Sequence, residues 1–148
     1  MIGTAEQDAF ITRNKWAVVT TLRGNGSPTN SVIFYARDGD ALVFSTTADR
    51  VKTKTLRRDP RVALTALDEG HPFGFVTVEG SATIHPVATD DAAVTWHASI
   101  LKAMMGPDTE PPEGYRERLL KEGRVIVRVS AERVSGVPDR GKRIARPR

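Results

Sequence analysis

The chain has 148 residues, contains no cysteine and carries a formal net charge of +4 at pH 7. This length suits one domain of ordinary size, and a hydrophobic content of 39% is enough to build a core. The missing cysteines exclude disulfides, thiolate metal ligands and a cysteine nucleophile. No apolar run approaches the roughly 20 residues that a membrane-spanning helix needs, and the N-terminus lacks a signal-peptide pattern, so we expect a cytoplasmic protein.

The positive charge is concentrated at the C-terminal end of the chain. Residues 139–148 contain five basic residues and one acidic residue, so the charges of residues 1–138 cancel. We therefore expect one folded domain over 1–138, followed by a flexible basic tail over 139–148. The expected domain has no basic stripe of the kind that nucleic-acid modules carry, and nucleic-acid binding is not expected.

The first half of the chain predicts a helix and then a run of strands. Residues 4–14 are expected to form a short helix, because Thr4 and Gln7 have the spacing of a capping box. Tight turns around Asn25-Gly26 and over 37–40 then separate three strands, and such short connections predict an antiparallel meander. The three strands are expected over 15–22, 29–36 and 41–46.

The second half alternates strands with helices. Gly80 lies inside a long expected strand, where a glycine indicates a bulge or a close approach of another backbone. Six strands with short turns and flanking helices predict a mainly β, α+β fold, in which a six-stranded antiparallel barrel carries helices at its ends. The expected helices of this half cover 49–58, 89–105 and 113–121, and the expected strands cover 62–67, 73–84 and 124–130.

The third expected strand ends in three hydroxyl residues, and two cations follow where a helix begins. These residues are Ser45, Thr46, Thr47, Arg50 and Lys52. The first N–H groups of a helix have no intrahelical acceptor, and the helix dipole makes this end positive. Hydroxyls and cations beside such an end favour a phosphate group.

The same basic residues have a second interpretation. Cations recur at helical spacing at Arg50, Lys54, Arg57 and Arg61. This spacing is also typical of a solvated helix face that binds nothing. From the residues alone, a phosphate site and a solvated face both stay open.

Asn30 is a polar residue on an expected strand face that is otherwise apolar. Alternation along the strand places it with Val32 and Phe34. A buried amide needs hydrogen-bond partners. Two interpretations stay open: the amide meets the donors and acceptors of a flavin-like ring, or it is a core asparagine that bonds to backbone groups.

No set of residues predicts catalysis by side chains. His71, His85 and His97 stand at no metal-ligand spacing, so we expect each to be structural or solvated. The chain contains no nucleophile elbow, no Walker loop and no dinucleotide glycine pattern. We therefore expect no catalytic side chain and no metal, and any redox chemistry is expected to come from a cofactor.

Several segments resemble the flavin/deazaflavin split β-barrel superfamily, also called the pyridoxamine 5′-phosphate oxidase-like group. The most specific similarity lies in the stretch from Leu42 to Arg61, which includes the hydroxyls, the cations and the sequence Asp59-Pro60-Arg61. The similarity extends over most of the chain. Its other segments are 16–22, 26–32, 78–82 and 124–136.

This resemblance implies a six-stranded split barrel that forms a homodimer, with two cofactor grooves at the dimer interface. It implies that Arg50 and Lys52 hold the cofactor phosphate, aided by the hydroxyls of Ser45, Thr46 and Thr47. Hydride transfer then takes place at the cofactor ring, and no catalytic side chain is obligatory. The residues implied to line the ring are Pro28, Thr29, Asn30 and Ser31.

Within the superfamily, the chain is shorter than the pyridoxamine phosphate oxidases and lacks a counterpart of their C-terminal substrate-phosphate motif. Its compact form is more similar to the F420-dependent reductases of actinobacteria. The deazaflavin cofactor F420 has a polyglutamate tail, which Lys54, Arg57 or the C-terminal basic residues are expected to receive. The predicted function is hydride transfer between F420 and an unsaturated or quinone-like small molecule. The alternatives are an FMN-binding oxidoreductase and a flavin-binding or storage protein without turnover.

Overall fold

The computed structural model of the chain describes residues 1–68, 70, 73–87 and 90–138. The predicted tail over 139–148, together with His71 and Thr89, lies outside the described residues. Four helices and seven strands form within the described part of the chain. They are α1 (Ala5–Arg13), β1 (Trp16–Leu22), β2 (Pro28–Phe34), β3 (Ala36–Asp38), β4 (Ala41–Thr47), α2 (Val51–Arg58), β5 (Arg61–Leu67), β6 (Phe75–Pro86), α3 (Asp91–Met105), α4 (Tyr115–Glu122) and β7 (Arg124–Ser135).

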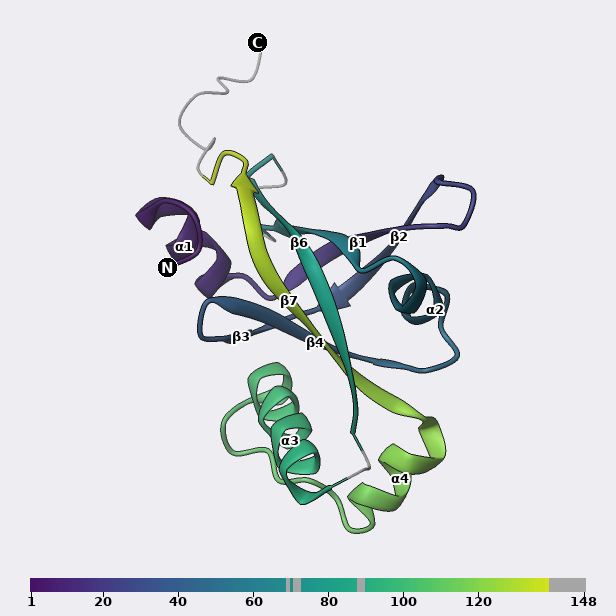
Figure 1. Cartoon of the computed structure of the whole chain (residues 1–148). Helices are drawn as coiled ribbons and strands as arrows, with labels where there is room; N and C mark the ends of the chain where they lie inside the picture. Colours follow the sequence, from purple (N-terminus) through teal and green to yellow (C-terminus); the bar gives the residue numbers. More distant parts are fainter. Residues whose placement is uncertain (69, 71–72, 88–89, 139–148) are drawn as a thin grey trace.

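The seven strands form one antiparallel sheet in the order β2-β1-β5-β6-β7-β4-β3. The two edge strands, β2 and β3, are neighbours in the chain, so the curved sheet returns toward its own edge without closing (Figure 1). The mainly β, antiparallel character predicted from the sequence is confirmed. The barrel is open and has seven strands, whereas six were expected.

The predicted strand over 29–36 is in fact two strands separated at Tyr35. Its backbone N–H donates to the carbonyl of Lys15 at 2.9 Å, and its hydroxyl donates to the carbonyl of Ile11 at 2.8 Å. These bonds hold a bend, after which β3 pairs with β4 while β2 pairs with β1. Both antiparallel hairpins of the expected meander form, but β2 and β3 lie at opposite edges of the sheet, so the expected continuous middle strand is wrong. Loop lengths carry no information about a bend inside a strand.

The interior of the barrel is the main hydrophobic core. Side chains alternate along β1, where Ala17, Val19 and Thr21 are buried and their neighbours are more exposed. Helix α1 covers one side of this core with Phe10 and Ile11, both 0% exposed. Its predicted capping box is confirmed, because the Thr4 hydroxyl accepts from the Gln7 N–H while the Gln7 side chain accepts from the Thr4 N–H.

A second hydrophobic cluster lies outside the barrel, where α3 and α4 meet β4 and β7. Figure 1 shows these two helices together at the end of the sheet that lies away from α1. Helix α3 begins after Asp90, whose carboxylate accepts from the Ala93 N–H at 2.7 Å. The helix expected over 89–105 therefore runs from Asp91 to Met105. The buried residues of the cluster are Val43, Val87, Ile100, Leu119 and Ile126.

The bulge predicted at Gly80 is confirmed. The pairing of β6 with β7 shifts register between Glu79 and Gly80, because Glu132 is an extra residue on β7. Strand β7 continues beyond this irregularity to Ser135, five residues further than expected. The extra residue interrupts the in–out alternation, which explains why the pattern indicated an earlier end.

Candidate functional site: the β4–α2 connection and its surroundings

The connection from β4 to α2 is a tight turn fixed by its own hydrogen bonds. The carbonyl of Thr47 accepts from the Thr53 hydroxyl at 2.7 Å and from the Arg50 N–H at 3.3 Å. The Thr47 hydroxyl donates to the Asp49 carboxylate at 2.5 Å. The turn therefore keeps the N-terminus of α2 in place against the end of β4.

Two cations stand at this helix N-terminus. Arg50 is the N-cap residue and is exposed, whereas Lys52 is half-buried. Neither forms an ion pair or a side-chain hydrogen bond within the described residues. Burial, and next the positive charge of Arg50, lower the pKa of Lys52. An anion bound between the two side chains would offset this repulsion.

The helix end adds to the same positive field. The first turn of α2 contains no acidic residue, and no side chain of the described residues caps its N–H groups. The carboxylate that lies beside it belongs to Asp49, whose pKa is lowered first by the hydrogen bond from Thr47 and in smaller part by Arg50 and Lys54. The arrangement suits a phosphate ester, which brings the acceptor oxygens that these groups lack.

The three hydroxyls predicted to help hold the phosphate point to different places. The Thr46 side chain lies inside the barrel and is 5% exposed. The Thr47 hydroxyl is bonded to Asp49, and the Ser45 hydroxyl lies 2.7 Å from Nε2 of His97. The structure therefore brings together the two cations and the helix end, whereas each hydroxyl is buried or already has a partner.

Ser45, His97 and Tyr115 form a hydrogen-bonded chain that could not be predicted from the sequence. The other ring nitrogen of His97, Nδ1, lies 2.5 Å from the Tyr115 hydroxyl. The three residues come from β4, α3 and α4, and no short motif links them. Burial, and next the positive charge of Arg124, lower the pKa of His97 to about 4, with Glu122 acting in the opposite direction. His97 is therefore neutral at pH 7 and ties the α3–α4 cluster to β4.

Because the pKa of His97 is lowered in the folded protein, we expect the protein to lose stability in mild acid. An unfolded histidine takes up a proton near pH 6.5, whereas folded His97 does so only near pH 4. Between these two values the unfolded chain binds more protons, so the free energy of unfolding falls as the pH falls, by about 3 kcal/mol in total. Urea unfolding at several pH values measures this loss.

Two variants separate the effect of His97 from that of other groups. In His97→Asn, the part of the pH dependence between pH 6.5 and 4 that comes from this residue disappears. His85→Asn removes an exposed histidine that is not part of this hydrogen-bonded chain and serves as the control. Equal profiles for the wild type and His97→Asn would contradict the assigned protonation of His97.

The residues predicted to line a cofactor ring lie on both faces of β2. Asn30 is exposed on the outer face, where its side-chain oxygen accepts from the Thr20 hydroxyl at 2.6 Å. The expectation of a buried amide is therefore wrong. The hydrogen-bond partner of Asn30 is Thr20 on the neighbouring strand β1, and the sheet face that carries both residues is exposed. Thr29 and Ser31 are half-buried on the opposite face, and Pro28 is exposed at the start of the strand.

Helix α2 and the start of β2 lie at the same end of the barrel. The Thr55 hydroxyl donates to the Thr21 hydroxyl at 2.8 Å, which joins α2 to β1. Thr21 in turn pairs with Thr29 across the β1–β2 ladder. The fold therefore brings together two segments that are about 20 residues apart in the chain. They are the start of α2, predicted to hold a phosphate, and the start of β2, predicted to line the cofactor ring. Lys54 and Arg57 are exposed on α2.

The outer face of the sheet next to Asn30 is hollowed and partly apolar. A cavity of about 370 Å³ lies over β1, β5 and β6, with Thr20, Leu22 and Ala63 in its lining. Trp16 and Val32 on the same face are 41% and 67% exposed. Exposed apolar side chains on a sheet face often mark an interface.

The described residues contain no cluster of three or more histidine or acidic side chains that is arranged to hold a metal ion. A separate finding concerns membranes: none of the described helices combines the length and the hydropathy that crossing a bilayer requires.

The family pattern of pyridoxamine 5′-phosphate oxidase matches residues 4–137, nearly the whole chain. The chain belongs to this family. The match includes both the β4–α2 connection and β2, so the resemblance inferred from the sequence is confirmed. Members of the pyridoxamine 5′-phosphate oxidase family bind flavin-type cofactors on a split barrel, the fold described above.

Solved structures agree with this assignment. An F420 reductase is 27% identical, with 86% of this chain and 94% of that chain covered and a TM-score of 0.68. The conserved hypothetical protein Rv2991 from Mycobacterium tuberculosis is 25% identical, with coverages of 95% and 87% and a TM-score of 0.75. An FAD-binding protein from Mesorhizobium loti, at 22% identity, coverages of 92% and 95% and a TM-score of 0.65, shares the fold.

Proposed function

We propose that this chain is an oxidoreductase that binds F420 and transfers a hydride between this deazaflavin and an unsaturated or quinone-like small molecule. The observation that carries the proposal is the pair of cations at the N-terminus of α2, Arg50 and Lys52, neither of which forms an ion pair with any described residue. The similarity to an F420 reductase supports the choice of deazaflavin. The bound cofactor supplies the hydride chemistry at its ring.

The protein's own residues bind and orient this cofactor. Arg50 and Lys52 hold its phosphate together with the open N–H groups of α2. Lys54 and Arg57, exposed further along the helix, receive the carboxylates of the polyglutamate tail. Because Ser45 and Thr47 already have hydrogen-bond partners and Thr46 is buried, these hydroxyls contribute less than the cations. Pro28, Thr29, Asn30 and Ser31 lie nearest the ring.

A second copy of the chain completes the site in this proposal. Trp16 and Val32 leave apolar area exposed on the outer sheet face, beside Asn30 and the cavity over β1 and β5. A homodimer covers this face and places the partner's wall against the cofactor ring. The acceptor then enters from the groove between the two copies. The cytoplasmic location expected from the sequence remains a prediction.

FMN is the alternative cofactor, because it also combines a tricyclic ring with a phosphate that Arg50 and Lys52 would hold. Titration of the purified protein with F420 and with FMN, followed by quenching of cofactor fluorescence, separates the two. We expect a colourless protein that binds F420 more tightly than FMN. A yellow protein that retains FMN would favour the FMN enzyme, and tight binding without reduction of any acceptor in a broad panel would favour storage. Failure to bind either cofactor would refute all three.

A further inference from the structure

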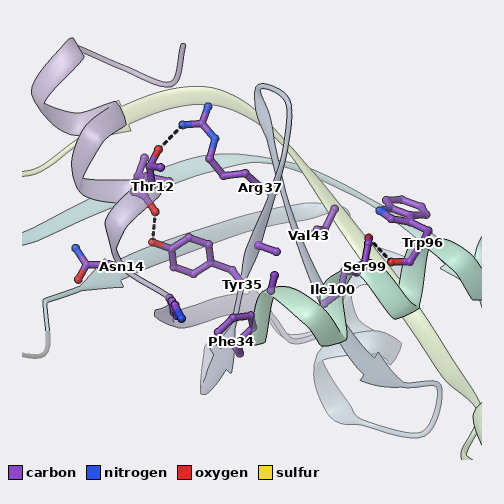
Figure 2. A pocket seen from close by; sticks show the side chains of 13 residues that line it. Thr12, Asn14, Phe34, Tyr35, Arg37, Val43, Trp96, Ser99 and Ile100 are labelled. Carbon is purple, nitrogen blue, oxygen red and sulfur yellow. Dashed lines mark hydrogen bonds between the residues drawn. The ribbon is translucent and has the colours of Figure 1, made fainter. Parts of the chain in front are cut away.

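A second cavity of about 340 Å³ lies on another side of the molecule, between the end of α1, the bend from β2 to β3, and α3 (Figure 2). None of the residues proposed to bind the cofactor lines it. Its size falls within the range of small-molecule sites, about 300–1,000 Å³. The lining residues are Ile11, Thr12, Asn14, Lys15, Phe34, Tyr35, Ala36, Arg37, Val43, Trp96, Ser99, Ile100 and Ala103.

The bottom of the cavity is formed by buried aliphatic side chains, and aromatic side chains form part of its walls. Ile11, Val43 and Ile100 are almost completely buried beneath the cavity. Phe34 and Trp96 are partly exposed and come from two different elements, Phe34 from the end of β2 and Trp96 from α3 (Figure 2). Partly exposed aromatic rings over an apolar bottom suit an aromatic ligand, because such a ligand can pack against ring faces and edges.

Most polar groups that line the cavity are already bonded within the protein. The Tyr35 hydroxyl donates to the Ile11 carbonyl, and the Ser99 hydroxyl donates to the Trp96 carbonyl at 2.6 Å. Arg37 pairs with Asp8 at 2.9 Å and donates to the Gly39 carbonyl. These bonds, two of them drawn in Figure 2, keep the walls in place and use most of the donor hydrogens of these groups within the protein.

Lys15 differs from these groups. It is exposed, it lines the cavity, and within the described part of the chain its ammonium group has no acidic partner. The side-chain carbonyl of Asn14 beside it accepts no hydrogen bond from the described residues, since the amide of this residue only donates, to Phe10. A cation without a partner beside an apolar cavity favours a ligand with one negative charge at its edge.

We propose that this cavity is a binding site for a small aromatic anion, such as an aromatic carboxylate or sulfonate of two or three rings. The rings lie between Phe34 and Trp96, and the anionic group faces Lys15. The site is separate from the proposed cofactor site and exists in each copy of the chain. The proposal of this site is therefore independent of whether the protein binds F420.

The experiment uses two probes of nearly the same shape. 8-Anilinonaphthalene-1-sulfonate is an aromatic anion, and N-phenyl-1-naphthylamine is its uncharged analogue. Both are titrated into the full chain while their fluorescence is recorded. The chain has two tryptophans, so the variant Trp16→Phe leaves Trp96 as the donor for energy transfer to a probe bound in this cavity.

Three variants test the site. Ala103→Trp fills the cavity from α3 and is expected to weaken both probes at least about tenfold. Lys15→Gln is expected to weaken the sulfonate by about three- to fivefold, as for an exposed charge pair, and to leave the uncharged probe unchanged. The control Lys121→Gln removes an exposed cation of α4 and is expected to change neither affinity.

Other outcomes overturn the proposal. If Val32→Asp abolishes probe binding while Ala103→Trp does not, the probes bind the outer sheet face. If Ala103→Trp alters the oligomeric state and leaves probe binding unchanged, a second copy of the chain occupies the cavity. If Lys15→Gln weakens both probes equally, the site has no preference for anions. Cofactor titration of the same variants reports separately on the proposed function.

Discussion

Replacing Lys52 with alanine is expected to weaken F420 binding by about 10- to 150-fold. A charge-assisted hydrogen bond to phosphate contributes about 1.5–3 kcal/mol, and each 1.4 kcal/mol corresponds to a tenfold change in affinity. Lys52 is half-buried beside Arg50, so its charge is poorly solvated and has no acidic partner within the described residues. Quenching of deazaflavin fluorescence measures the affinity.

The stability of the cofactor-free protein distinguishes a binding role from a structural one. Burial and the neighbouring charge of Arg50 disfavour the charged form of Lys52, as its lowered pKa indicates. Lys52→Ala is therefore expected to leave the free energy of unfolding unchanged or slightly higher, while affinity falls. Lys121→Ala, which removes an exposed cation of α4, serves as the control. Unchanged affinity for F420 and for FMN would remove Lys52 from the site.

Local sequence signals predicted much of this fold correctly. The capping box at Thr4 and Gln7, the helix after β4 and the bulge at Gly80 all depend on residues within a few positions of one another. The split barrel was predicted from the family resemblance. The most specific segment of that resemblance is the continuous stretch 42–61, with its hydroxyls and cations. The cation pair of the candidate site belongs to this stretch, which is why it was visible in the sequence.

The features that the sequence did not predict depend on distant contacts. The bend at Tyr35 is held by Lys15 and Ile11, about 20 residues earlier in the chain. Asn30 pairs with Thr20 on β1, and no described element covers this side of the two strands, so the Asn30 side chain is exposed. The hydrogen-bonded chain through His97 joins three elements whose proximity appears only once the sheet has formed.

The site and the α3–α4 cluster are therefore physically connected. Ser45 stands on β4 two residues before Thr47, whose carbonyl anchors the first turn of α2. The His97 ring holds the Ser45 hydroxyl on the outer side of the same strand. The cluster of α3 and α4 thus supports the strand end from which the proposed phosphate site begins. The cations themselves lie on α2, so a change in α3 acts on them only through β4.

Substituting Gly80 with alanine is expected to destabilise the fold by about 3 kcal/mol, the upper end of the usual range for overpacking. A Cβ atom at this position would stand 1.8 Å from the backbone oxygen of Ser130 on β7. No real contact is that short, and a backbone oxygen held in the β6–β7 ladder cannot move aside as a flexible side chain can. The bulge would have to open, with loss of pairing between the two longest strands. Urea unfolding measures the change.

Gly24→Ala is the matched control for this substitution. Its Cβ would lie 3.4 Å from the end of the Arg58 side chain, an ordinary contact with a group that can shift. Because alanine also reduces the conformational freedom of the unfolded chain, this variant is expected to be as stable as the wild type or up to about 1 kcal/mol more stable. If Gly80→Ala matched Gly24→Ala in stability, the close approach of β6 and β7 at the bulge would be wrong. The larger effect is expected at Gly80, because there the obstacle is backbone that the sheet itself fixes.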